Sequence, residues 1–251
     1  MKLNIVPART GYTWVKLGIG TFFKQPLALA GLFFLYMAAI LLVAQIPYIG
    51  IFIGGMLVPG ATLGLMAAAA EAVTGKFPMP AVLLSAFRAG RSRGRAMLIL
   101  GAIYTAGSLV ATRLAMLLAG PGAATTQGTE FDFTAIVALA LHAPLFLMFW
   151  HAPALVHWHD VPPVKSLFFS VVACFRNFGA LAVYAMLWLG VFLGAGIVFG
   201  LLGTMLGGAL MARAVMMPTA LLLAAMFSTS IYFTFRDSFV ADEPLPTGET
   251  P

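Results

Sequence analysis

Four histidines are the residues of this sequence with the clearest capacity for chemistry. They lie within one stretch, at His142, His151, His157 and His159. Imidazole is the commonest metal ligand in proteins, so a metal site is the first chemistry to consider. No pair has the i, i+4 spacing that brings two imidazoles to one face of a helix, where each residue turns by about 100°. We therefore expect no metal site and no cofactor, and we interpret the histidines as polar groups that bond to neighbouring helices.

His151 is the most informative of the four, because Pro153 follows it two residues later. A proline inside a helix removes a hydrogen bond and frees a backbone carbonyl one turn earlier. Broken membrane helices with an ionisable side chain mark substrate or proton paths in transporters. Two interpretations of an intramembrane polar site at His151 and His142 follow, a permeation path or interhelical hydrogen bonds that serve packing. Packing is favoured, because a polar group in a membrane is costly unless it is bonded, and the absence of an Asp or Glu near the middle of any predicted span weakens the case for an ion-coupled transporter.

A basic stretch from Pro78 to Arg95 is the second feature with a recognisable chemistry. It places four arginines beside an apolar segment, at Arg88, Arg91, Arg93 and Arg95. The pattern recurs where Pro162 leads to Arg176, and a fainter copy includes Lys24. Basic residues next to a bilayer gain about 1 kcal/mol each from anionic headgroups. We expect the four arginines and Arg176 to contact anionic membrane lipids.

Composition makes the bilayer the solvent for most of the chain. Of its 251 residues, 61% are hydrophobic and 9% are charged, whereas a soluble domain carries about 25% charged residues. The net charge of +6 would suit nucleic acid. The bases lie between apolar runs without a reading motif, however, so we expect no nucleic-acid partner. The single cysteine, Cys174, excludes an intrachain disulfide.

Long uncharged runs predict six transmembrane helices, because about 20 apolar residues cross a hydrocarbon core of about 30 Å. The expected ranges are about 27–46, 51–70, 96–119, 134–158, 179–206 and 215–235. Pro47 begins the turn between the first two, and Pro59 should kink the second. The predicted fold class is an all-α polytopic membrane helix bundle. Three interfacial amphipathic helices accompany its spans, near 9–24, 78–95 and 161–178.

The predicted organisation is a single transmembrane domain over residues 1–236, followed by an acidic tail, 237–251, that we expect to be disordered. Three units of a surface helix plus a hairpin repeat within the domain, at about 9–72, 78–158 and 162–236. Of the 14 basic residues, all but Arg113 and Arg213 fall on one side of this topology. The positive-inside rule therefore places both termini in the cytoplasm and the loop with Glu130 and Asp132 outside.

The fifth predicted span contains glycine pairs at a spacing of four residues. The pairs are Gly190 and Gly194, Gly196 and Gly200, and Gly203 and Gly207. This spacing favours close helix packing, either inside the protein or in a homo-oligomer. No nucleotide loop, nucleophile elbow or zinc-protease histidine pair is present, so we expect no catalytic residues and no enzymatic activity. Glu71, at the end of the second span, should cap that helix or pair with Lys76.

Five stretches make the chain resemble an uncharacterised family of six-span inner-membrane proteins from proteobacteria. They begin at Ile5, Phe23, Phe77, Phe149 and Lys165 and read IVPAR, FKQPLAL, FPMP, FWHAPALVHWH and KSLFFS. The resemblance covers nearly the whole chain and implies a multi-pass protein of the bacterial inner membrane. The layout is also loosely similar to the membrane domain of some glycerophosphodiester phosphodiesterases. We expect a non-enzymatic membrane or lipid-associated factor. The alternative is a small permease with a path near His151, between proline-kinked even-numbered spans.

Overall fold

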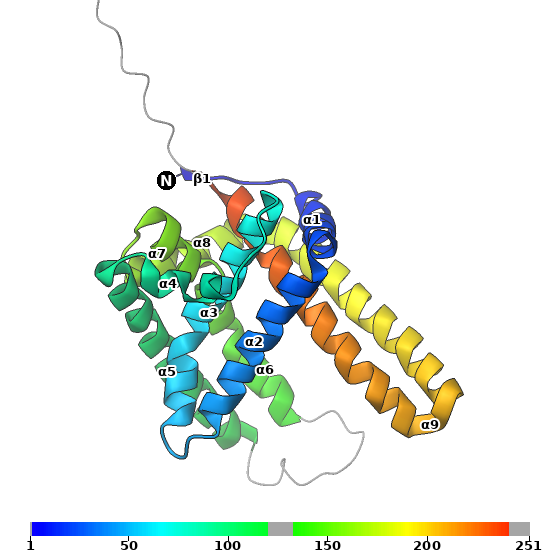
Figure 1. Ribbon diagram of the computed structural model, residues 1–251. Helices are drawn as coiled ribbons and strands as arrows, with labels where there is room; N and C mark the ends of the chain where they lie inside the picture. Colours follow the sequence, from blue (N-terminus) through cyan, green and yellow to red (C-terminus); the bar gives the residue numbers. More distant parts are fainter. Residues whose placement is uncertain (1, 120–132, 241–251) are drawn as a thin grey trace, which may run out of the picture. The chain divides into compact units, whose positions relative to one another are not determined.

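The computed structural model describes residues 2–119 and 133–240, and its regular structure is almost entirely helical (Figure 1). The elements follow in the order β1 (Lys2–Leu3), α1 (Thr10–Lys24), α2 (Pro26–Ala44), α3 (Gly50–Val73), the 3-10 helix η1 (Pro80–Leu84), α4 (Ser85–Arg88), α5 (Arg91–Ala119), α6 (Phe133–Phe149), α7 (Ala152–His159), α8 (Pro163–Arg176), α9 (Phe178–Ser238) and β2 (Phe239–Val240). The predicted all-α class is confirmed. The predicted outer loop with Glu130 and Asp132 lies outside the described residues.

Contacts divide the chain into two compact units, which we describe separately. Unit 1 comprises Met1–Pro26 and Phe175–Pro251, and unit 2 comprises Leu27–Cys174. Unit 1 therefore joins the first surface helix, α1, to the last hairpin, α9, from the other end of the chain. The division into three sequential units of a surface helix plus a hairpin stays a prediction.

The six predicted spans are found as five long apolar helical runs, because the last run is folded back on itself. Within the described residues, α2, α3, α5, the α6–α7 run and α9 are long and apolar enough to cross a membrane. Helix α9 has 61 residues, or about 90 Å of helix, which is three times the hydrocarbon thickness. Its helical geometry breaks at Gly207 and Gly208, where Gly208 has a φ of 71°. The two arms of α9 run back alongside each other from this break (Figure 1).

The pairing of the two short strands supports an even number of crossings. Strand β1 is antiparallel to β2, with Lys2 opposite Val240 and Leu3 opposite Phe239. Hydrogen-bonded strands must lie on the same side of a bilayer, because no open sheet spans its core. The chain between Lys2 and Val240 therefore crosses the membrane an even number of times, so α9 counts as two spans.

The start of the acidic tail is ordered, which corrects the predicted boundary at residue 237. The buried Asn177, 1% exposed, donates from Nδ2 to the carbonyl of Asn4 at 3.0 Å and to Oγ of Ser238 at 3.1 Å. Its Oδ1 accepts the N–H of Val6 at 2.9 Å. Residues up to Val240 are thus fixed against the N-terminal segment, and 241–251 lie outside the described residues.

In unit 2, the second surface segment is shorter than its sequence pattern predicts. The segment η1–α4 ends at Arg88, and Gly90, with a φ of 111°, turns the chain into α5. Arg91, Arg93 and Arg95 therefore form the first turns of a spanning helix instead of continuing the surface helix. Helix α3 runs continuously through Pro59 from Gly50 to Val73.

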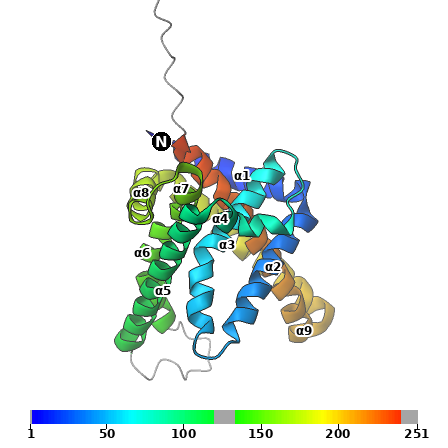
Figure 2. The same cartoon turned by 60° about the vertical axis from the view of Figure 1, so that its left-hand side comes forward.

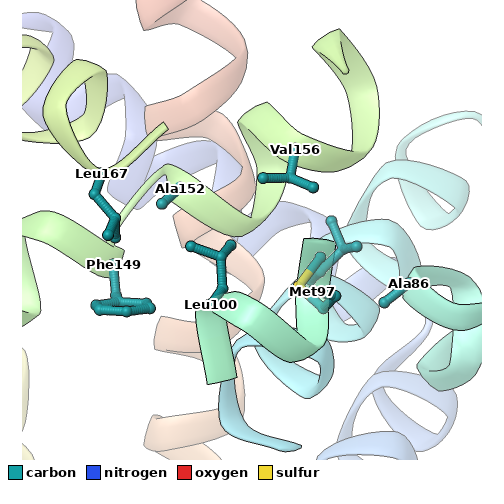
Figure 3. Packing of buried hydrophobic residues seen from close by; sticks show 8 residues of the cluster. Ala86, Met97, Leu100, Phe149, Ala152, Val156 and Leu167 are labelled. Carbon is teal, nitrogen blue, oxygen red and sulfur yellow. The ribbon is translucent and has the colours of Figure 1, made fainter. Parts of the chain in front are cut away.

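An apolar cluster fixes the surface segments to the spanning helices at one end of unit 2, where α4, α7 and α8 lie (Figure 2). It takes one or more side chains from each of α3, α4, α5, α6, α7 and α8 (Figure 3): Leu63, Ala86, Met97, Leu100, Phe149, Ala152, Val156 and Leu167. The small residues Ala86 and Ala152 are fully buried, so these short helices approach α5 closely. The cluster therefore fixes the positions of polar residues that adjoin its members in the sequence, such as Ser85, His151 and His157.

Candidate functional site

The break between α6 and α7 is bridged by a side chain from α8. The N–H of His151 donates to Oγ of Ser170 at 3.0 Å, and the same hydroxyl donates to the carbonyl of Leu147 at 2.7 Å. In an unbroken helix the His151 N–H would donate directly to that carbonyl, four residues earlier. The Ser170 hydroxyl is therefore inserted into the hydrogen-bond ladder, two residues before Pro153. The helix is thus interrupted beside the proline that was expected to disturb it, and the Ser170 hydroxyl satisfies the His151 N–H and the Leu147 carbonyl.

The two histidines predicted as an intramembrane polar site have different surroundings. His151 is 1% exposed and lies at the bridged break. The His142 ring instead lies 2.8 Å from the carbonyl of Ala138 through Nδ1 and 3.4 Å from Oγ of Ser108 through Nε2. Neither histidine lines the two pockets described below. This arrangement favours the packing interpretation and does not favour the permease alternative.

Cys174 lies on the same inward face of α8, where it is buried. Its Sγ lies 3.8 Å from the carbonyl of Leu147. Burial raises the pKa of its thiol to about 12, although a hydrogen bond with Ser170 acts in the opposite direction. Among the described residues, no three His, Cys, Asp or Glu side chains gather closely enough to hold a metal ion.

The outward face of α8 differs sharply from this inward face. Phe168 and Phe175 are 66% and 65% exposed, and the basic Lys165 and Arg176 are exposed with them. Large aromatic and basic side chains on one face of a helix are typical of a helix that lies in the headgroup region. Arg176, a predicted lipid contact, therefore lies on the face that suits this role.

The four arginines of the basic stretch lie in two structural settings. Arg88, Arg91 and Arg95 are exposed at the end of α4 and the start of α5. Arg93 lies 3.5 Å through Nε from Oδ1 of Asp160, with side chains 38% and 73% exposed. Asp160 adopts a left-handed φ of 54° as the C-cap of α7. An exposed pair of this kind contributes at most about 1 kcal/mol to stability. Asp160 offsets one of the four positive charges, so the four arginines together remain strongly basic.

A pocket of about 560 Å³, here called the polar pocket, lies beside Arg88. Its charged and polar lining consists of Glu71, Lys76, Ser85, Arg88 and His157. Two of its atoms, Oγ of Ser85 and Nδ1 of His157, are buried and hydrogen-bond to none of the described residues. Buried polar atoms usually have a hydrogen-bond partner, so these two atoms can donate to a group that enters the pocket.

Glu71 and Lys76 are joined through the backbone and not through the predicted ion pair. The carbonyl of Glu71 accepts the N–H of Lys76 at 3.0 Å and the hydroxyl of Thr74 at 2.8 Å. In the described chain, no ion pair joins the two side chains. The side chains of Glu71 and Lys76 both line the polar pocket. Of the charged and polar residues of this pocket, the sequence pointed only to Arg88 as a ligand contact.

A second pocket of about 300 Å³, here called the apolar pocket, lies against the same η1–α4 segment. Its lining includes Leu35, Tyr36, Leu57, Leu83, Leu84 and Phe87. Ser85 and Arg88 line the polar pocket, whereas their neighbours Leu84 and Phe87 line the apolar one. The η1–α4 segment therefore separates a charged site from an apolar site.

The chain was compared with known proteins. No family model matches it, and no solved structure matches it. A probable inner membrane protein of Burkholderia thailandensis is 40% identical over 261 residues, which cover 97% of this chain and 96% of the relative. This likeness extends over both units and supports the inner-membrane resemblance predicted from the sequence. The resemblance in layout to the membrane domain of some glycerophosphodiester phosphodiesterases stays a prediction.

Proposed function

The chain belongs to the family of this probable inner membrane protein, and from that premise we propose that it is a non-enzymatic factor that holds anionic lipid at one face of the membrane. Its long apolar helices make it an integral, multi-pass membrane protein. The proposed ligands are anionic phospholipid headgroups. The proposed contacts are Arg88, Arg91, Arg93, Arg95 and Arg176.

One observation carries this proposal. Arg88, Arg91 and Arg95 are exposed together where α4 meets α5, and in the described chain Asp160 is the acid within ion-pair distance of this arginine group. Phosphate oxygens are the usual partners of exposed guanidinium groups at a membrane surface. Three arginines with no acidic partner among residues 2–119 and 133–240 therefore favour an anionic headgroup layer over a neutral one.

The exposed faces of the surface helices α1 and α8 also support binding to lipid headgroups. Phe168 and Phe175 on α8, and Tyr12 and Phe23 on α1, are large and exposed, and basic residues lie near them. Aromatic rings in this position anchor a helix at the level of the headgroups. We propose that α1 and α8 lie in the interface, with their bases at the phosphates.

We also propose that this face is cytoplasmic, as the positive-inside rule predicts. A cysteine in place of Lys2 should then be labelled from the cytoplasm, and one in place of Tyr48, in the turn between α2 and α3, from outside. Both variants would carry Cys174→Ser. Labelling of both positions from the periplasmic side would contradict this orientation.

Lipid binding is tested by replacing Arg91, Arg93 and Arg95 with glutamine, which keeps hydrogen bonding and removes charge. Losing about 1 kcal/mol per base predicts a loss of up to about 3 kcal/mol of lipid interaction. The purified variant should retain less phosphatidylglycerol and cardiolipin, and added cardiolipin should raise its melting temperature less than it raises that of the wild type.

Arg113→Gln is the matched control, because Arg113 lies near the other end of α5. It should retain lipid as the wild type does. Equal lipid retention and equal cardiolipin stabilisation in the triple variant, with unchanged topology, would show that these arginines only orient the protein during insertion.

A further inference from the structure

The polar pocket has the composition of an anion site. Lys76 and Arg88 supply two positive charges, and Glu71 supplies one negative charge. The buried Oγ of Ser85 and Nδ1 of His157 add two groups that can donate hydrogen bonds, the second in the tautomer that protonates Nδ1. Cationic and neutral donors around one cavity match the several acceptor oxygens of a phosphate.

The local structure holds these donors in place. Ser85 precedes Ala86 and His157 follows Val156, and both apolar neighbours are buried in the cluster of Figure 3. A Cβ at Gly64 would lie 2.6 Å from Cα of Leu83, so α3 and η1 are in backbone contact beside the pocket. Donors on packed elements are preorganised, which lowers the entropic cost of binding.

The polar pocket is large enough to hold a small molecule and not only a water. Its volume of about 560 Å³ lies within the range of about 300–1,000 Å³ typical of small-molecule sites. Phe77 and Met79, which line it as well, are exposed apolar side chains. A group entering past them would combine a charged head with an apolar remainder.

We propose that the polar pocket binds a phosphate group, with Arg88 and Lys76 as its cationic partners and Ser85 and His157 as its neutral donors. This site deepens the proposed lipid-binding function, on which it rests, by naming the chemistry that is recognised. The phosphate can belong to a phospholipid headgroup or to a free phosphate, and the two sources are separable. The apolar pocket on the other side of η1–α4 favours the lipid.

The experiment measures the melting temperature of the full chain, purified in uncharged detergent and freed of lipid. One series is titrated with inorganic phosphate, and a second with mixed micelles containing phosphatidylglycerol. Ser85→Ala should weaken the apparent affinity about tenfold, and Arg88→Gln by a further order of magnitude, because hydrogen bonds to charged groups are the stronger ones. Ser92→Ala and Arg113→Gln, at exposed positions outside the pocket, should bind phosphate as the wild type does.

Two further variants guard against misfolding as the cause of lost binding. Ser85→Thr keeps the hydroxyl and should keep the affinity. Glu71→Gln removes the carboxylate that the described residues contribute to the pocket and should raise the affinity several-fold. A damaged protein does not produce such a gain.

The outcomes distinguish a lipid phosphate from free phosphate, and they test the pocket separately from the lipid contacts of Arg91, Arg93 and Arg95. Stabilisation by phosphatidylglycerol alone assigns the site to a lipid headgroup, and equal stabilisation by inorganic phosphate assigns it to free phosphate. Unchanged affinity of Ser85→Ala, Arg88→Gln and Glu71→Gln for both probes overturns the pocket. Arg91, Arg93 and Arg95 do not line the polar pocket. If their replacement leaves lipid retention unchanged, phosphate binding in the pocket is therefore still supported by its own test. If the pocket variants bind phosphate normally, the lipid test of the three arginines is likewise unaffected.

Discussion

The indole Nε1 of Trp14 donates a hydrogen bond of 2.9 Å to Oδ2 of Asp237, 223 positions later in the chain. Trp14 is fully buried between α1 and α9. Asp237 also accepts from Nε of Arg236 at 2.8 Å. The first surface helix is thus bonded to the end of the last span.

Trp14→Phe should destabilise the protein by about 1–3 kcal/mol, because it leaves a partly buried carboxylate without one of its donors. Thermal unfolding in detergent measures the effect. Tyr12→Phe, at an exposed position on the same helix, serves as the control and should unfold as the wild type does. If both variants unfold alike, the bond between Trp14 and Asp237 contributes nothing to stability.

Two glycines of α1 should respond oppositely to alanine. A Cβ on Gly18 would collide with Cβ of Ser230 on α9, whereas a Cβ on Gly20 would meet no atom within 4 Å. Gly18→Ala should therefore cost about 1–3 kcal/mol through overpacking. Gly20→Ala should gain up to about 1 kcal/mol from helix propensity. The order of the two melting temperatures checks the packing of α1 on α9, and a reversed order would refute it.

Ser170→Ala should destabilise the protein by about 1–3 kcal/mol, since both the His151 N–H and the Leu147 carbonyl lose their partner. Ser166→Ala, one turn earlier on α8, is the matched control. The Ser166 hydroxyl donates only to the carbonyl of Pro163 in its own helix, at 2.7 Å, so its loss should cost less. Equal losses in the two variants would mean that the bridge across the α6–α7 break contributes no special stability.

Cys174 should resist alkylation in the native protein at pH 8 and react quickly after denaturation. Burial raises the pKa of its thiol to about 12 from an ordinary value of 9.0, and the thiolate is the reactive form. The raised pKa also makes the folding stability depend on pH. The folded protein holds this proton more tightly than the unfolded chain, so stability from this group falls as pH rises from about 9 towards 12. Maleimide labelling followed by mass measurement checks the first point, and rapid native labelling would contradict it.

The proposed homo-oligomer depends on glycines that face no other part of the described chain. A Cβ on Gly190 or Gly194 would meet no atom within 4 Å, whereas one on Gly203 would lie 2.5 Å from Cα of Ala212 in the second arm of α9. Replacing Gly190 and Gly194 together with leucine should abolish chemical cross-linking between copies without lowering thermal stability. Cross-linking at the wild-type level would exclude this face as the interface.

The spanning helices were predictable because their signal is local. An uncharged run from Gln25 to Ala70 is too long for one crossing, and the turn near Pro47 divides it in the structure as in the prediction. A disturbance beside His151 was predictable for the same reason, since Pro153 has no N–H to donate to the carbonyl one turn earlier.

The remaining features depend on partners far apart in the sequence. Gly11 and Gly18 weaken the helix propensity of α1, but the structure uses them for close contact with Ala180 and Ser230. Asp237 belongs by composition to an acidic tail, yet Trp14 holds it in place. Ser85 and His157 line one pocket only because α4 and α7 pack on the same spanning helices. No local pattern marks such pairs.

The bond between Trp14 and Asp237 can form only late in synthesis. The 223 positions between them take a ribosome roughly 10 to 45 seconds to translate at about 5–20 residues per second. For most of that interval α1 has been made and the arms of α9 have not. Its exposed Tyr12 and Phe23 suit it to wait at the lipid surface while the later spans enter. The last turn of α9 is therefore the one that fixes α1 in the fold.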